Sequence, residues 1–215
     1  MPAARPAPDR ATLQARLRAG TGELGLALTV EQSGSLLDYL DLLVRWNAVY
    51  NLTAVRDPAE MVTRHLLDSL AIAPLVRGAT LVDLGTGPGL PGIPLAILAP
   101  DRAVTLVDSN GKKTRFLREA VRVLGLANVR VEQARVEEVA GQYDCVTARA
   151  FAALGDILTW GGQLLAPDGI CVAMKGVIDE GELRGIPPDF RIEQIVPLSV
   201  PGLGAARHAI ILRRS

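Results

Sequence analysis

The residues with the clearest chemical potential are an acid and three glycines in the run Asp83-Leu-Gly85-Thr-Gly87-Pro-Gly89, at the end of a predicted strand, Thr80–Leu84. Glycine permits a sharp turn and lets a ligand approach the backbone closely. Pro91 suits the first turn of the helix that should follow. Three glycines at alternate positions between a strand and a helix indicate a ligand-binding turn more specifically than an isolated pair of glycines does. We therefore expect this run to bind a nucleoside.

Two further segments should converge on the same site. Asp108 ends the second predicted strand, Ala103–Val107, where an acid can accept hydrogen bonds from both hydroxyls of a ribose. Ala134-Arg-Val-Glu137 follows the third predicted strand and can pack against an adenine. Loops at the carboxyl ends of neighbouring parallel strands meet in one crevice. Asp108 has an alternative role as the N-cap of a helix that begins near Ser109.

The acid at the start of the glycine run indicates which nucleoside is bound. The carboxylate of Asp83 can meet the cationic ammonium of S-adenosylmethionine, although it can also serve only to cap the turn. Gly87, Gly89 and Gly92 match the Gly-x-Gly-x-x-Gly spacing of dinucleotide sites, so a nicotinamide cofactor is an alternative. We expect a methyltransferase. A nucleotide-binding module without catalysis is the alternative from another class.

Basic residues end the fourth and fifth predicted strands at this same edge. Arg149 can hold a methionine carboxylate or form a surface ion pair. Lys175 can contact a phosphate or merely end its strand. Both are candidates for positioning a substrate.

A second set of basic residues is a candidate surface for RNA. Residues 102–135 contain eight basic and three acidic side chains, although the whole chain has a formal net charge of zero. Helical spacing places several of them on one face, which can bind phosphate but is also typical of a solvated surface. Histidine at such a position often has a structural role. The candidates for RNA contact are Arg45, Arg64, His65, Lys112, Lys113, Arg115 and Arg118.

The elements that must position these residues alternate between short apolar strands and helices, which predicts an α/β fold with a seven-stranded, mostly parallel sheet. The 215 residues suffice for one sizeable core, and 49% of them are hydrophobic. The strands are expected at residues 80–84, 103–107, 129–132, 143–148, 169–174, 190–197 and 207–213. The helices between them are expected at residues 91–98, 112–125 and 154–165.

The N-terminal part has a different pattern. Residues 10–76 are expected to form a helical extension packed on the domain at residues 77–215, after a disordered tail at residues 1–9. Thr29 and Gln32 have the spacing of a capping box. Asp57-Pro-Ala-Glu60 has the capping acid and the proline that begin a second helix.

Several classes of protein lack support in this sequence. No stretch approaches 18 apolar residues, and the first residues lack the apolar segment of a signal peptide, so we expect a cytoplasmic protein without a membrane span. Cys145 and Cys171 stand in apolar runs without other ligands nearby, which favours core positions. We expect no metal site, and we expect a monomer.

The chain resembles the glucose-inhibited division protein B family, the bacterial 16S rRNA guanine-N7 methyltransferases, from about residue 40 to about residue 213. The first 30 or so residues show no such likeness. The most specific segments are Trp46-Asn-Ala-Val-Tyr-Asn-Leu-Thr53, Arg64-His-Leu-Leu-Asp-Ser69, the glycine run continued through Leu90-Pro-Gly-Ile-Pro94, Asp108-Ser, Lys112-Lys-Thr-Arg-Phe-Leu117, Arg135-Val-Glu-Glu138, Arg149-Ala-Phe-Ala152 and Met174-Lys-Gly176.

The expected fold is the Rossmann-like fold of class I S-adenosylmethionine methyltransferases. The resemblance implies transfer of a methyl group from S-adenosylmethionine to N7 of one guanine in 16S rRNA, either naked or within the 30S subunit. Arg149 can then present donors to O6 of that guanine as an alternative to its cofactor role. The resemblance also implies a ribose contact at Asp108. Other cofactor contacts are implied at Gly85, Leu90, Val136, Glu137 and Arg149. A methyltransferase of small molecules or proteins remains an alternative.

The segment after the fourth predicted strand lacks the motifs of two other classes of methyltransferase, which agrees with the implied chemistry. Ala148-Arg-Ala-Phe-Ala152 contains neither the Asn/Asp-Pro-Pro-aromatic motif of amine methylases nor the nucleophilic cysteine of pyrimidine C5 methylases. Guanine N7 has a free lone pair and no proton, so it needs no base and no covalent nucleophile. Catalysis would then depend on positioning and on oriented charge.

Overall fold

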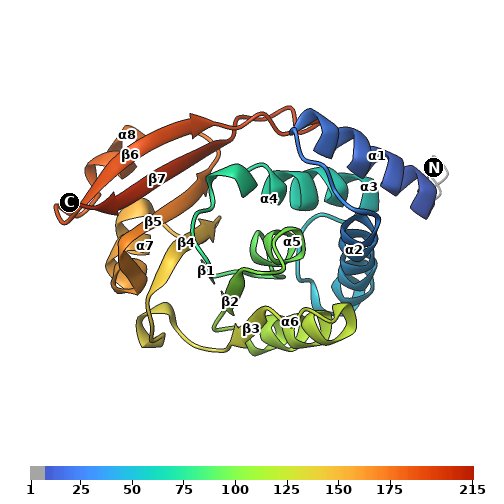
Figure 1. The fold of residues 1–215 in the computed structure, drawn as a ribbon, viewed down its shortest axis with the longest axis horizontal. Helices are drawn as coiled ribbons and strands as arrows, with labels where there is room; N and C mark the ends of the chain where they lie inside the picture. Colours follow the sequence, from blue (N-terminus) through green and yellow to red (C-terminus); the bar gives the residue numbers. More distant parts are fainter. Residues whose placement is uncertain (1–7) are drawn as a thin grey trace.

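A computed structural model describes residues 8–215, and seven strands in this part form one sheet in the order β3-β2-β1-β4-β5-β7-β6 (Figure 1). The strands β1 to β5 run parallel, and β7 is antiparallel to both of its neighbours. The predicted mostly parallel sheet is confirmed. The strands are β1 Thr80–Leu84, β2 Ala103–Val107, β3 Val129–Glu132, β4 Tyr143–Arg149, β5 Leu165–Lys175, β6 Phe190–Pro197 and β7 His208–Arg214.

Helices cover both faces of this sheet, and its inner strands β1, β2, β4 and β5 accordingly contain buried apolar runs, whereas β3 and β6 alternate apolar residues with polar ones. Along β1, Leu81 belongs to one buried core, whereas Val82 and Leu84 belong to the other, because successive side chains of a strand point to opposite faces. The helices after β1 are α5 Gly92–Leu98, α6 Gly111–Leu124, α7 Leu154–Gly161 and α8 Glu180–Arg184.

The N-terminal helices pack around α5 on one side of the sheet (Figure 1). They are α1 Arg10–Glu23, α2 Val30–Tyr50, α3 Pro58–Met61, a π-helical segment Val62–Leu67 and α4 Asp68–Leu70. Leu17 and Leu40 of this extension are buried in the same core as Leu106 of β2 and Phe116 of α6. The extension and the sheet therefore share one hydrophobic core.

The predicted helix starts are present. Thr29 and Gln32 form a reciprocal capping box at α2, and Asp57 caps α3. Asp9, which the sequence assigned to the tail, instead caps α1 by accepting a hydrogen bond from Thr12 N at 2.8 Å. The rest of the predicted tail, residues 1–7, lies outside the described residues.

The helix expected at residues 154–165 is shorter than predicted. The α-helix ends at Gly161, a 3₁₀ turn follows, and β5 begins at Leu165 instead of residue 169. A Cβ on Gly161 would lie 2.5 Å from Leu84 Cδ1, and one on Gly162 would lie 2.5 Å from Phe190 Cζ. This close packing against β1 and β6, which helical periodicity does not encode, accompanies the early end of the helix.

Two further expectations concern burial. Cys145 and Cys171 are free and buried in the core as predicted, and burial raises the pKa of each thiol to about 12. Within residues 8–215, no helix combines the length and the hydropathy needed to cross a membrane.

Candidate functional site

The glycine run forms the turn between β1 and α5 at the carboxyl edge of the sheet. Gly85, Gly87 and Gly89 have φ angles of 59°, 63° and 98°, a region that disfavours other residues. A Cβ on Gly85 would lie only 2.0 Å from the ring of Phe151. Tyr39 of α2 braces the turn, because its hydroxyl donates to Pro88 O at 2.7 Å. The sequence did not predict this contact.

Asp83 lies beneath the turn with no exposed surface. Its Oδ2 accepts from Gly92 N at 2.9 Å and from the Thr86 hydroxyl, and its Oδ1 accepts from the Thr147 hydroxyl at 2.9 Å. Burial raises the pKa of Asp83 to about 6. These contacts match the alternative role of Asp83, that of holding the turn, and the carboxylate lines neither of the cavities beside it.

Two cavities adjoin the turn, and Gly85, Lys113 and Ala150 line both. The β2 cavity, of about 460 Å³, lies beyond β2 and includes Asp108, Ala134, Val136, Glu137, Phe151 and Trp160. The β5 cavity, of about 360 Å³, lies beyond β4 and β5 and includes Asp68, Gly87, Leu90, Arg149, Lys175 and Arg207. The carboxyl edge thus brings together the predicted residues from the ends of five strands, β1 to β5.

The β2 cavity combines the carboxylate of Asp108 with two aromatic rings. Asp108 is 7% exposed, and its Oδ2 accepts from Gly87 N at 3.0 Å, which ties the end of β2 to the glycine turn. Asn110, not Asp108, caps α6. Across the cavity, the rings of Phe151 and Trp160 lie edge to face with centroids 6.0 Å apart. Such a cavity suits a group with hydroxyls at one end and an aromatic ring at the other.

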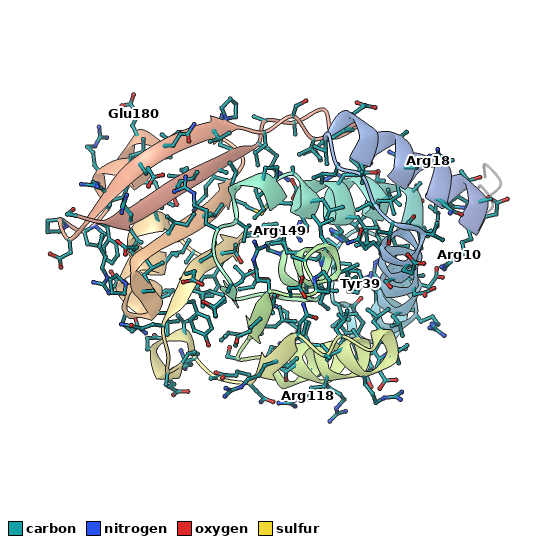
Figure 2. The ribbon with its side chains drawn as sticks, viewed as in Figure 1. Arg10, Arg18, Tyr39, Arg118, Arg149 and Glu180 are labelled. Carbon is teal, nitrogen blue, oxygen red and sulfur yellow. The ribbon has the colours of Figure 1, made fainter. Side chains whose placement is uncertain are left out.

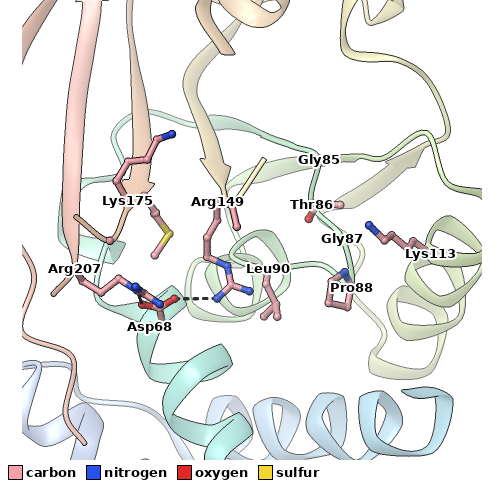
Figure 3. A pocket seen from close by; sticks show the side chains of 13 residues that line it. Asp68, Gly85, Thr86, Gly87, Pro88, Leu90, Lys113, Arg149, Lys175 and Arg207 are labelled. Carbon is pink, nitrogen blue, oxygen red and sulfur yellow. Dashed lines mark hydrogen bonds and ion pairs between the residues drawn. The ribbon is translucent and has the colours of Figure 1, made fainter. Parts of the chain in front are cut away.

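The β5 cavity is basic and is organised by one buried acid (Figure 3). Asp68, only 1% exposed, pairs with Arg149 Nη1 at 3.0 Å and with Arg207 Nε at 2.8 Å. Sequence reasoning identified Arg149 but assigned no role to Asp68 or Arg207. Arg207 and Asp68 stand 139 positions apart, so only the fold brings them together.

Lys175 braces the loop after β4. Its ammonium donates to Ala152 O at 2.7 Å and pairs closely with the carboxylate of Glu182 on α8. The same carboxylate oxygen of Glu182 accepts from Leu154 N at 3.0 Å, at the start of α7. Ala150, in the loop so held, has a φ of 49°.

The residues predicted to contact RNA separate into surface and interior positions. Lys112, Arg115 and Arg118 are exposed on α6, and Arg45 is exposed on α2. Arg64 is also exposed, and its Nε lies 3.8 Å from Oε2 of Glu60. Figure 2 shows Arg118 pointing away from the molecule, whereas Arg149 and Tyr39 point inward.

His65 does not fit its prediction as an RNA contact. It is 6% exposed, and its Nε2 lies 2.9 Å from the hydroxyl of Thr53. Burial lowers the pKa of His65 to about 4, so the ring is neutral at pH 7. It holds the loop between α2 and α3. Among residues 8–215, no group of three or more acidic, histidine or cysteine side chains has the arrangement of a metal site.

Known proteins resemble this chain in fold and in sequence. A solved S-adenosylmethionine-dependent methyltransferase of Aquifex aeolicus aligns with a TM-score of 0.58 and 17% identity, covering 75% of this chain and 96% of its own. At that identity the likeness concerns the fold alone. It confirms the predicted Rossmann-like, class I methyltransferase architecture.

Closer relatives identify the family. A protein of Stenotrophomonas maltophilia named ribosomal RNA small subunit methyltransferase G is 54% identical over 205 residues, which are 94% of this chain and 96% of that protein. A protein of the same name from Neisseria meningitidis is 50% identical over 201 residues, covering 93% and 97%. The family model described as GidB, rRNA small subunit methyltransferase G, matches residues 32–211. The resemblance seen in the sequence is confirmed: the chain belongs to this family of methyltransferases.

Proposed function

We propose that this protein transfers a methyl group from S-adenosylmethionine to N7 of a guanine in 16S rRNA. The observation that carries the proposal is the pair of adjoining cavities on either side of Gly85, one with a carboxylate and aromatic rings and the other basic. Membership of the rRNA small subunit methyltransferase G family supports it.

The side chains of the β2 cavity fit the nucleoside half of the cofactor. Asp108 would accept hydrogen bonds from the ribose hydroxyls. Val136 and Phe151 would flank the adenine, with Glu137 at the rim. Asp83 would act indirectly, because its hydrogen bonds hold the turn that the cofactor contacts.

The methionine half would extend past Gly85 toward Leu90 and Arg149. A guanidinium suits a carboxylate because it donates two parallel hydrogen bonds. When bound, the cofactor supplies an electrophilic methyl group on a sulfonium. The chain supplies no base in this cavity: Asp68 is held by two arginines, and Lys175 is held by Glu182. N7 needs none, so the residues act by orienting the guanine and excluding water.

The rRNA would approach over the rim of the β5 cavity. Lys113 faces the cavities, and Lys112, Arg115 and Arg118 continue outward along α6, so they would meet phosphates beyond the target nucleotide. Arg45 and Arg64 would contact RNA on the side of the helical extension. We further propose that the protein acts as a monomer in the cytoplasm, on 16S rRNA or on the 30S subunit.

Methyl transfer from labelled cofactor to naked 16S rRNA, 30S subunits and total cell protein tests the proposal. Nucleoside analysis should detect 7-methylguanosine in at least one RNA sample and no label in protein. Calorimetry should register binding of S-adenosylmethionine but not of NAD. Absence of 7-methylguanosine from both RNA samples would exclude the proposed substrate, and binding of NAD alone would exclude the cofactor.

A further inference from the structure

The buried carboxylate of Asp68 holds two guanidinium groups at the wall of the β5 cavity. Two positive charges against one negative charge leave a local excess of one. A partly buried cation without a counter-ion is costly, so this arrangement is suited to anionic ligands. Lys175 and Lys113 do not change that count, because Glu182 and Asp108 lie beside them.

The two arginines occupy different places relative to the glycine turn. In Figure 3, Arg149 lies between Asp68 and the turn, whereas Arg207 lies on the far side of Asp68. Arg149 Nη1 donates to both Asp68 Oδ2 and Arg64 O, each at 3.0 Å. Arg149 is therefore the arginine beside the turn where a methionine carboxylate would lie.

Arg207 stands at the outer end of the cavity. It precedes β7, and because β7 is antiparallel to β5, its start lies next to Lys175 at the end of β5. Its Nε donates to Asp68, and its Nη1 donates to Ala206 O at 3.3 Å. Among the described residues Nη2 has no hydrogen-bond partner, and the side chain is 28% exposed. A fixed guanidinium thus presents a free donor edge to the cavity and to solvent.

We propose that Arg207 binds a backbone phosphodiester of the rRNA at the target nucleotide, while Arg149 serves the cofactor. The inference rests on the proposed function and adds to it a phosphate subsite. A phosphodiester is an anion whose oxygens match the planar donors of a guanidinium, and the Nη2 edge of Arg207 is not used by the protein contacts described above. Asp68 fixes the Arg207 side chain in advance, so less conformational entropy is lost when the phosphate binds.

The test compares Arg207→Gln with Arg213→Gln, a control that removes a positive charge from the other end of β7. Binding of 16S rRNA and of 30S subunits is measured over a series of salt concentrations, and cofactor affinity is measured by calorimetry without RNA. Arg207→Gln should weaken RNA binding about tenfold and lower the slope of log affinity against log salt by about one phosphate contact. It should leave cofactor affinity within about twofold, while the control changes neither.

Three outcomes would overturn the inference. If Arg207→Gln weakens cofactor binding and leaves RNA binding intact, Arg207 holds the methionine carboxylate. If it behaves as Arg213→Gln does while the wild type binds and methylates RNA, the phosphate subsite is wrong and the proposed function stands. If the wild type neither binds nor methylates RNA, the proposed function itself fails.

Arg207→Lys is a second variant for the case that Arg207→Gln does not fold, because lysine keeps the positive charge beside Asp68. This variant should retain the salt slope of the wild type and lose several-fold in RNA affinity, since lysine cannot donate the paired hydrogen bonds of a guanidinium. Unchanged RNA affinity in Arg207→Lys would also contradict the inference. Thermal unfolding of each variant identifies any that does not fold.

Discussion

At the scale of single residues, Asp83 and Asp108 show how similar sequence signals lead to different roles. Both are acids at strand ends beside the glycine run, and the sequence assigned both to the cofactor. Asp83 is enclosed by three protein donors, whereas Asp108 lines a cavity. The sequence predicted the place of each acid, but not which of them faces a ligand, because that depends on Thr147 of β4.

Asp108→Ala should weaken S-adenosylmethionine binding by about 1–3 kcal/mol, the range for loss of a buried hydrogen-bonding partner. Calorimetry measures the affinity directly. Asp101→Ala, an exposed acid in the turn before β2, is the control and should bind as the wild type does. Equal affinities for the two variants would remove Asp108 from the cofactor site.

The raised pKa of Asp83 predicts a pH-dependent stability. The folded protein holds this proton up to about pH 6, while the unfolded chain releases it near pH 3.8. The stabilisation from protonated Asp83 is therefore complete below pH 3.8 and is lost as the pH rises through 6. Compared with Asp83→Asn, the wild type should gain about 2 kcal/mol between pH 7 and pH 4.5. Urea unfolding at the two pH values measures the free energy of unfolding of both proteins. If the difference between the wild type and the variant is the same at both pH values, the raised pKa of Asp83 is wrong.

His65 should act in the opposite direction. Its pKa falls from 6.5 to about 4 on folding, so the unfolded chain binds the proton more tightly, and stability declines as the pH falls from 6.5 toward 4. His65→Gln should therefore lose less stability than the wild type on acidification. The same urea series measures this, and a steeper loss in the variant would disprove the assigned shift.

At the scale of elements, α8 links two loops of the site through one carboxylate. Glu182 pairs with Lys175 and accepts from Leu154 N, at a helix start whose N-cap, Ala153, has no side-chain hydrogen bond of its own. A Cβ on Gly155 would lie 2.5 Å from Gly185 O, so α7 and α8 approach closely.

Glu182→Ala should therefore lower stability by about 1–3 kcal/mol, because it uncaps α7 and leaves Lys175 without its partner. Cofactor affinity should also fall, since Ala150 and Phe151 lie in the loop that is released. Glu180→Ala, on the same helix but 87% exposed, should change stability by less than about 0.5 kcal/mol. Urea unfolding and calorimetry compare the pair, and equal effects would exclude the bracing role.

The elements themselves were largely predictable, because apolar periodicity and capping residues are local. Thr29, Asp57 and the alternating strands and helices after residue 79 all appear where the sequence indicates. The sequence predicted a helix after Asp57 but not the π-helical form of Val62–Leu67, and it did not predict α8. Gly161 ends α7 against Leu84, a contact between residues far apart in the sequence. The partners of Arg149 were hidden for the same reason.

At the scale of the whole molecule, the helical extension is part of both the core and the site. Leu40 and Leu66 pack in the same core as Leu106, and the extension supplies Tyr39 to the glycine turn and Asp68 to the β5 cavity. The extension cannot be removed without exposing one face of the sheet.

A chain that begins at residue 77 should consequently fail to unfold cooperatively, because its sheet would lose the cover of α1, α2 and α4. A chain lacking only residues 1–8 keeps Asp9 as the cap of α1 and should match the full chain. Circular dichroism during heating distinguishes them. A cooperative transition in the chain that begins at residue 77 would show that the domain folds without the extension.

The ion pair between Asp68 and Arg207 has a consequence for the timing of synthesis. Asp68 is synthesised 139 residues before Arg207. The carboxylate of Asp68 can therefore pair with Arg149 before Arg207 has been synthesised. The basic cavity is complete only after β7 has inserted between β5 and β6. The basic cavity therefore cannot be complete until the other six strands of the sheet have been synthesised.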